Sequence, residues 1–291
     1  MNEVYKNSGF VVLATIFFVV NDAVINHLTL QEVKFYHFMF YGTLPFLGVP
    51  ALLIIRGNLK AKLSSTNYMV PILRGLIFIP MPYIAFISLK NISLPEFTTL
   101  NMASPIFATI LSLIFLREKI NFPLVISLIF GVLGVLFVVQ PGFEKFNIYF
   151  LLVLLGSFFL ALTTLIVNKF NNTISTEGYF IFGGLPIHLL SFCLFLLDPL
   201  FLDGFTLVLV LLSSVLVNSA IFLIAYSFQR AQKFYGSISC LIYLQILWSV
   251  LIGFIAFDEY LNHFALIGSF FIFISGFLSM IAQRMQLKNS N

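Results

Sequence analysis

A few polar and titratable side chains lie within the long apolar runs of this sequence, and these could do chemistry. Asp22 is the one acidic residue inside such a run, where a carboxylate could bind an amine or carry a coupling proton. His37 and His188 are further titratable candidates, and Arg74, near the start of another run, could attract an anion. Each also has a plainer explanation: an interfacial cap for Asp22, hydrogen-bonded structure for the histidines, and a snorkelling anchor for Arg74.

A second set of side chains could bind a ligand through hydrogen bonds and aromatic contact. A carboxamide in hydrocarbon needs a partner, and an aromatic ring with one polar edge suits a ligand pocket. The substrate-binding candidates are Asp22, Asn26, Tyr83, Asn101, Thr164, Asn218, Tyr243, Gln245 and Trp248. The candidates for coupling or gating are Asp22, His37, Arg74, Pro105 and His188. Pro105 interrupts backbone hydrogen bonding within its run, so it is either a static kink or a hinge.

The sequence contains no recognisable site for making or breaking bonds. It has no H-E-x-x-H, no glycine-rich phosphate loop, no G-x-S-x-G and no clustered metal ligands. We therefore expect no enzyme activity, no cofactor and no metal. The sequence also has no nucleotide-binding module. If the chain transports a solute, that transport would therefore run downhill or be coupled to an ion gradient, with H⁺ as the candidate ion.

The composition limits the kind of fold that can position these residues. Of the 291 residues, 60% are hydrophobic and 9% are charged, whereas soluble domains carry about 25% charged residues. So few charges could not cover a soluble protein without leaving large apolar patches. This excludes a soluble enzyme, a disordered protein and a nucleic-acid binder. The apolar runs are continuous rather than alternating, which predicts an all-α polytopic membrane protein.

Ten apolar runs, each near the ~20 residues needed to cross a bilayer, predict ten transmembrane helices. The predicted spans are 9–27, 35–55, 69–89, 96–116, 122–140, 147–168, 177–197, 205–227, 236–257 and 262–283. An even number of spans puts both termini on one side. All of the 15 Lys and Arg residues except Lys34, Lys90 and Lys145 fall on that side. Short loops rich in these residues stay in the cytoplasm, so we expect both termini there, with the protein in a bacterial inner or plasma membrane.

Residues 1–145 and 146–291 resemble each other as two repeats of five spans. Offsets of 141 and 142 residues align polar or small residues at several positions. The aligned pairs are Glu118 with Glu259, Ser127 with Gly268, Gly134 with Ser275, Asp22 with Thr164, and Asn26 with Asn168. Because five is odd, the second repeat must enter the membrane from the opposite side. Inverted repeats of this kind suit alternating access, with the substrate held between the halves.

Several helices carry polar or small residues at steps of three and four, which places them on one face. The stripes are Thr15, Val19, Asp22 and Asn26; Thr98, Asn101, Pro105, Ala108 and Ser112; Ser157, Ala161, Thr164 and Asn168; Ser214, Asn218, Ile221 and Ala225; and Ser239 with Tyr243. Such stripes are either helix–helix contacts or the walls of a cavity. The spans at 122–140 and 262–283 have few polar residues, and we expect them to form scaffold or dimer contacts.

Short motifs along the whole chain resemble the drug/metabolite transporter superfamily, EamA type. They are Asn21-Asp22, Leu73-Arg74-Gly75-Leu76, Ser104-Pro105-Ile106-Phe107, Leu116-Arg117-Glu118, Gly131 with Gly134, Tyr243 to Trp248, and Phe257-Asp258-Glu259. The resemblance implies ten helices in two inverted repeats around a cavity lined mainly by helices one, three, four, six, eight and nine. The spacing is most similar to a branch that includes S-adenosylmethionine uptake carriers. His37 replaces a common Arg and Gln245 a common Glu of that branch, which weakens the case for a zwitterionic or cationic substrate.

The sequence supports one main hypothesis and one alternative from another class. The main hypothesis is a secondary transporter, monomeric or homodimeric, that moves a small organic metabolite across the inner membrane by alternating access. The substrate class is an amino acid or a nucleoside-like compound of the S-adenosylmethionine type, and the partners are this solute and the lipid bilayer, not nucleic acid. The alternative is a non-transporting membrane enzyme or assembly factor, which would concentrate titratable residues at one membrane face.

Overall fold

The computed structural model describes residues 2–115, 122–139, 147–231 and 240–289, and this part of the chain is helical without a strand. The long unbroken helices are α1 (Asn2–Thr29), α9 (Phe122–Val139), α10 (Ile148–Lys169), α11 (Thr176–Leu197), α12 (Gly204–Ala231) and α15 (His263–Asn289). Six segments of the described chain are long and apolar enough to cross a membrane: Gly9–Thr29, Phe35–Ile55, Met69–Leu89, Ile148–Lys169, Thr176–Leu197 and Gly204–Arg230. Shorter apolar helices occupy Val125–Val138, Leu241–Phe257 and His263–Leu278. The protein is thus an all-helical polytopic membrane protein, and the count of ten spans stays a prediction.

Four of the predicted spans are each built from two consecutive helices. These pairs are α2 (Phe35–Tyr41) with α3 (Thr43–Ile55), α5 (Met69–Phe78) with α6 (Pro80–Leu89), α7 (Leu94–Asn101) with α8 (Ser104–Phe115), and the 3-10 turn η2 (Cys240–Tyr243) with α14 (Leu244–Phe257). Proline explains two of the breaks, at Pro80 between α5 and α6 and at Pro105 between α7 and α8. A proline has no N–H to donate to the carbonyl four residues earlier. Pro105 leaves the carbonyl of Asn101 without that donor, and α7 ends there. The short α4 (Leu59–Leu63) connects α3 to α5.

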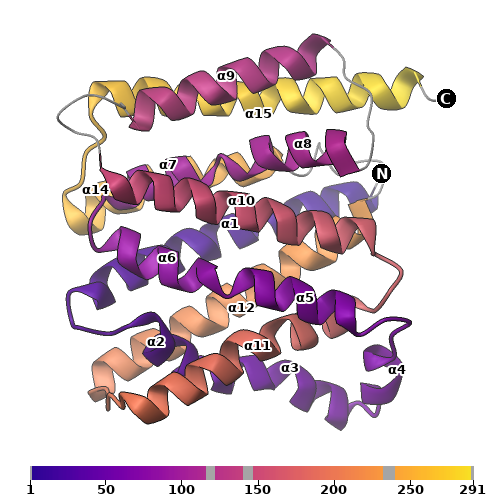
Figure 1. Ribbon diagram of the computed structural model, residues 1–291, viewed down its shortest axis with the longest axis vertical. Helices are drawn as coiled ribbons and strands as arrows, with labels where there is room; N and C mark the ends of the chain where they lie inside the picture. Colours follow the sequence, from indigo (N-terminus) through magenta and orange to yellow (C-terminus); the bar gives the residue numbers. More distant parts are fainter. Residues whose placement is uncertain (1, 116–121, 140–146, 232–239, 290–291) are drawn as a thin grey trace.

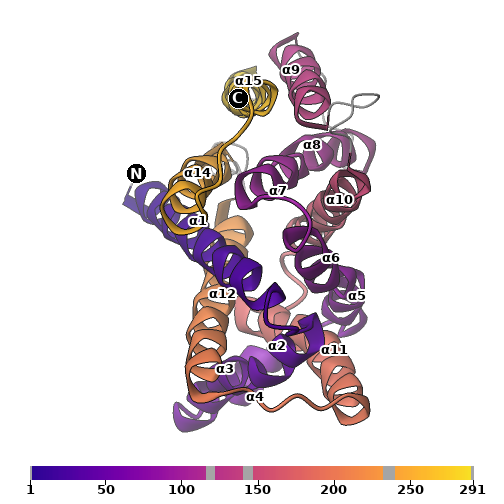
Figure 2. The ribbon, with the colours of Figure 1, turned by 90° about the vertical axis from the view of Figure 1, so that its left-hand side faces the viewer.

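The helices run side by side and form a ring with one pair outside it (Figures 1 and 2). In Figure 2, α1, α12, α11, α5, α6, α10, α7 and α14 surround the centre, while α9 and α15 pack on each other beyond α7 and α14. Large apolar residues such as Leu47, Leu136, Leu155 and Leu212 are exposed on the outer faces. A soluble protein rarely exposes such extensive apolar surface, so these faces are suited to lipid.

The pair α9 and α15 is held by matching contacts at two positions. The Ser127 hydroxyl donates to the Ser275 carbonyl at 2.7 Å, and the Ser275 hydroxyl donates to the Ser127 carbonyl at 2.7 Å. Two turns away, a Cβ atom on Gly134 would lie 2.8 Å from the Gly268 carbonyl oxygen, and one on Gly268 would lie 2.6 Å from the Gly134 oxygen. The two helices are therefore antiparallel, and their backbones approach so closely that only glycine fits at this crossing.

The first prediction concerns this crossing. Gly268→Ala should lower the thermal midpoint in detergent, because its methyl group would meet main-chain atoms of α9, and overpacking costs about 1–3 kcal/mol. Gly134→Ala should lower it by a similar amount. Gly48→Ala is the control, since no atom of the described residues lies within 4 Å of a Cβ at that position in α3. Equal midpoints for Gly268→Ala and Gly48→Ala would contradict the close crossing.

Candidate functional site

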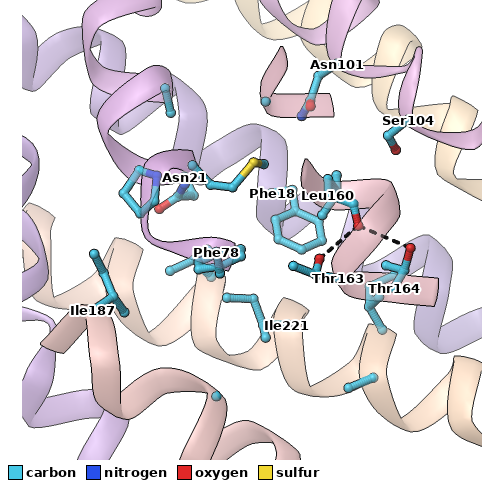
Figure 3. Close-up of a pocket in the computed structure, with 18 of the residues that line it drawn as sticks. Phe18, Asn21, Phe78, Asn101, Ser104, Leu160, Thr163, Thr164, Ile187 and Ile221 are labelled. Atoms are coloured by element: carbon cyan, nitrogen blue, oxygen red, sulfur yellow. Dashed lines mark hydrogen bonds between the residues drawn. The ribbon is translucent and has the colours of Figure 1, made fainter. Parts of the chain in front are cut away.

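A cavity of about 300 Å³ lies inside the ring. Side chains reach it from α1, α2, α3, α5, α6, α7, α8, α10, α11, α12, η2 and α14, whereas α4, α9 and α15 contribute none of its lining among the described residues. Figure 3 shows Asn21, Phe78, Asn101 and Thr164 around it, each from a different helix. The wall is mostly apolar and aromatic, with a small number of polar groups, which is the usual make-up of a small-molecule pocket.

The lining residues of each helix follow helical periodicity. In α12 they include Ser214, Asn218, Ile221, Ala225 and Phe228, a face about 21 Å long at ~1.5 Å rise per residue. The predicted polar stripe of this helix therefore lies along the cavity wall.

In α1 and α10 the cavity face is rotated from the predicted stripe. Thr15, Val19, Ser157 and Ala161 are buried in helix contacts and are not among the lining residues. The hydroxyls of Thr15 and Ser157 donate to carbonyls of their own helices, Val12 at 2.6 Å and Leu154 at 2.7 Å. A serine or threonine satisfied in this way can face a neighbouring helix as readily as a cavity.

Most of the predicted site residues come together at the cavity. Among the substrate-binding candidates, Asp22, Asn101, Thr164, Asn218, Tyr243 and Gln245 line it. Among the coupling and gating candidates, Asp22, Arg74 and His188 line it. Their roles in binding or coupling stay predictions. Pro105 is the second residue of α8. The boundary between the two repeats, at residues 145 and 146, falls outside the described residues.

The remaining candidates do not line the cavity. The Asn26 amide donates to a carboxylate oxygen of Glu259 at 3.4 Å, and the Trp248 indole N–H donates to the Thr15 hydroxyl at 3.3 Å. His37 Nε2 lies 2.8 Å from the Asp198 carbonyl oxygen. Tyr83 is 49% exposed and packs edge-to-face on Phe35. These four polar groups therefore face helix contacts, loop ends or the outer surface of the bundle.

The polar groups in the cavity wall are bonded mainly to protein. The Asn21 amide donates to Asp22 Oδ1 at 3.2 Å, and the Ser213 hydroxyl donates to Asn21 Oδ1 at 3.0 Å. The Asn218 amide donates to the Ser214 carbonyl at 2.8 Å. The Thr163 and Thr164 hydroxyls donate to the Leu160 carbonyl at 2.8 and 3.2 Å (Figure 3). Asp22 has no Lys, Arg or His nitrogen within 4.0 Å in the part of the chain that the structure describes.

His188 is fixed in the wall by its ring and by one nitrogen. Its imidazole stacks on Phe46 with ring centroids 4.2 Å apart. Its Nδ1 atom lies 3.0 Å from the Thr43 hydroxyl and 3.2 Å from the Met39 carbonyl oxygen. These contacts tie α11 to α2 and α3.

Sequence reasoning missed several lining residues. Asn21 and Thr163 are direct neighbours of chosen residues, and Phe18 and Ile25 lie four residues before and three after Asp22. Stepping along the helix from Asp22 would have found the latter two. The aromatic lining residues Phe78 and Phe180 gave no signal, because the chain contains 37 Phe.

At the end of the bundle where α1 finishes, Glu259 forms a junction between helices. The Leu94 backbone N–H at the start of α7 donates to Glu259 Oε2 at 2.9 Å, and the Asn26 amide of α1 donates to Oε1 at 3.4 Å. Burial raises the pKa of Glu259 above its usual value, although these two hydrogen bonds act in the opposite direction. This carboxylate thereby joins the end of α14 to α1 and α7.

A second junction at the same end centres on Asp198. The Lys34 ammonium donates to Asp198 Oδ2 at 2.8 Å, and the Tyr36 hydroxyl donates to the same oxygen. These two hydrogen bonds hold the pKa of Asp198 below its usual value. At the opposite end, Lys62 pairs with Glu177 at 2.9 Å, and the Ser175 hydroxyl donates to the Lys62 carbonyl at 2.7 Å. Contacts between the two halves of the chain are thus present at both ends of the helix bundle.

The comparisons with known proteins agree with this architecture. A protein of known crystal structure has a TM-score of 0.66 to this chain at 15% identity, and the match covers 96% of this chain and 99% of the other. That likeness shows the fold alone. An uncharacterized transporter from Archaeoglobus fulgidus is 33% identical over 90 residues, which are 29% of this chain and 32% of the relative. The match thus spans about a third of that relative's length.

Residues 8–140 match the EamA-like transporter family. The resemblance drawn from the sequence motifs is therefore confirmed for this part of the chain.

The second prediction concerns the Glu259 junction. Glu259→Ala should lower the thermal midpoint of the detergent-solubilised protein, because the buried residues Asn26 and Leu94 lose the acceptor for their donors, at a cost of about 1–3 kcal/mol. Asp258→Asn is the matched control. Its side chain has no hydrogen bond to another described residue, and asparagine tolerates the positive φ of 52° at this position. A Glu259→Ala midpoint equal to that of Asp258→Asn would contradict a stabilising junction.

Proposed function

We propose that the chain is a secondary transporter that moves a small organic metabolite across a bacterial inner membrane by alternating access. In this proposal ten transmembrane helices form two inverted repeats, residues 1–145 and 146–291, and both termini are cytoplasmic. The central observation is the cavity, which receives one helical face from each of eight predicted spans. Contacts between the two halves lie at both ends of the surrounding bundle.

The contact between α9 and α15 supports the inverted repeat. At an offset of 141, Ser127 corresponds to Gly268 and Gly134 corresponds to Ser275. The observed pairs are Ser127 with Ser275 and Gly134 with Gly268. Exchanging every residue for its equivalent converts one pair into the other, as a twofold axis between the helices would require.

The packing of the other helices supports the same symmetry. The proposed repeat makes α1 equivalent to α10, α5 and α6 equivalent to α12, and α8 equivalent to part of α14. The contact of α1 with α12 then has its counterpart in the contact of α10 with α5 and α6. In the same way, α1 on α14 corresponds to α10 on α8, and α11 on α5 corresponds to α12 on α3.

Junctions between the halves at both ends suit alternating access. Opening one end would break the contacts of Asp198 and Glu259, whereas opening the other would break those of Lys62 with Glu177 and Ser175. These are a few polar contacts, two of them ion pairs with partly exposed side chains. Exposed pairs of this kind are individually weak, so the two ion pairs add little to the cost of opening either end.

The third prediction tests the cavity as the solute site. The assay is uptake from a mixture of metabolites into proteoliposomes that contain the purified chain. Asn101→Ala and Asn218→Ala should each lower uptake about tenfold, because losing one hydrogen bond to a bound solute is worth about 1–3 kcal/mol. Tyr83→Ala, which changes an exposed residue outside the cavity, should transport as wild type.

Uptake that is equally insensitive to all three substitutions would contradict the site. A wild-type chain that carries no solute but processes a substrate or retains a protein partner would instead be the membrane enzyme or assembly factor.

The fourth prediction concerns H⁺ as the coupling ion. Asp22 lines the cavity and is nearly fully buried, with an amide donor from Asn21 and no cationic partner among the described residues. A carboxyl group in such a place can be neutralised by a proton. Asp22→Asn should therefore abolish the stimulation of uptake by a pH gradient while downhill exchange continues. Undiminished stimulation in Asp22→Asn proteoliposomes would exclude this residue as the coupling site.

A further inference from the structure

Arg74 is a cation in the cavity wall to which the described protein supplies no counter-charge. It is the sixth residue of α5 and lines the cavity. Its Nε atom is buried and has no hydrogen-bond partner among the residues that the structure describes. The ion pairs between described residues involve Lys34, His37 and Lys62, not Arg74. Tyr179, which interacts electrostatically with Arg74, donates its hydroxyl to the Phe170 carbonyl at 2.6 Å and is not a counter-ion.

The fold makes room for this guanidinium beside α11. The crossing of α5 and α11 is close, because a Cβ atom on Gly75 would collide with the Gly183 carbonyl oxygen. A Cβ atom on Gly183 would lie 2.7 Å from Nη1 of Arg74. The guanidinium therefore occupies space that any other residue at position 183 would fill. An arginine that snorkels extends its head group to the membrane surface, whereas here the Nε atom is enclosed and Nη1 lies against the α11 backbone.

A guanidinium with a buried Nε atom that has no partner and with no counter-charge nearby is unfavourable unless a ligand completes it. The planar guanidinium is suited to bidentate hydrogen bonds with a carboxylate or a phosphate group. We propose that Arg74 binds an anionic group, carboxylate or phosphate, on the solute that occupies the cavity. This rests on the proposed transport function, which it makes more specific.

The remainder of the wall indicates the body of that solute. Phe18, Phe78, Phe180 and Phe228 line the cavity, and its volume is at the small end of the range for ligand pockets. Asp22 lines the same cavity but is more than 4.0 Å from Arg74, since the two form no ion pair. The solute is therefore a small organic anion with an apolar or aromatic body, and a cationic group on it would be placed at Asp22 rather than at Arg74.

The first experiment needs no knowledge of the natural solute and no transport. The purified full-length chain in nanodiscs is treated with phenylglyoxal, which modifies arginine, and labelling at each arginine is followed by mass spectrometry. Benzoate, phenyl phosphate and the uncharged benzamide serve as probes of similar shape. At least one of the two anions should slow labelling of Arg74 at least fivefold, and benzamide should not. Arg56, an exposed residue beyond α3, is the internal control.

Protection by benzoate alone identifies a carboxylate site, and protection by phenyl phosphate alone identifies a phosphate site. The proposal is overturned if the rate at which Arg74 is labelled is the same in the presence of each of the three probes. It is also overturned if Arg74 stays unmodified while Arg56 reacts, because the guanidinium would then be inaccessible from the cavity.

The second experiment uses uptake of mixed metabolites into proteoliposomes. Arg74→Gln should lower accumulation of carboxylates or phosphates at least tenfold, and Arg74→Lys, which keeps the charge, should recover part of it. Gly183→Ala keeps the charge but displaces the guanidinium, so it should give an intermediate loss. Lys60→Gln, an exposed change in α4, is the control, and thermal midpoints report whether each variant is folded.

The two experiments separate failure of this inference from failure of the proposed function. If the wild type accumulates only uncharged or purely cationic solutes, the anion site is wrong and the transporter stands. If the wild type accumulates nothing but anions still protect Arg74 from labelling, the anion site stands and the transport function is wrong.

Discussion

The absence of water inside a bilayer governs this structure, because every polar group within the helices must find a partner in the protein. Hydroxyl groups need no second helix for this, because they can donate to carbonyls of their own helix, as Thr15, Ser157 and Thr164 do. Carboxamides and carboxylates need partners on other elements, as Asn26 and Glu259 do. The Nε atom of Arg74 has neither kind of partner among the described residues, and Arg74 lines the cavity, where a ligand can supply one.

The positions of the helices could be predicted from the sequence with little loss. Each of the ten predicted ranges coincides, within the described residues, with one helix or two consecutive ones. Length and hydropathy are sufficient for this, because a bilayer imposes one thickness on every crossing segment. Breaks within the spans were harder to place. Pro105 indicated one, but the break at Gly42 between α2 and α3 lies at a close tertiary contact, where a Cβ atom would lie 2.8 Å from the Ser214 hydroxyl oxygen.

The candidate site was predicted only in part, and the physical reason is the same for each residue that lies elsewhere. A polar side chain in an apolar run needs a partner, but the sequence does not say whether that partner is a ligand or another helix. Asn101 and Asn218 line the cavity, whereas Asn26 and Trp248 are bonded to Glu259 and Thr15. Residues from α2, α3 and α11 also line the cavity, although the family resemblance emphasised other helices. The lining residues of these three helices are largely phenylalanine or glycine. In a sequence so rich in phenylalanine, such residues cannot be told apart from those that only pack between helices.

The two serine bonds between α9 and α15 have a property that a single hydrogen bond would lack. Each hydroxyl donates to the main chain of the opposite helix, so the bonds share neither a donor nor an acceptor. Losing one side chain removes one bond and leaves the other intact, since main-chain carbonyls are present whatever the residue. The connection is therefore redundant. A chain built in this way can accept changes in one half without a simultaneous change in the other, and the two halves are free to diverge in sequence while their junction holds.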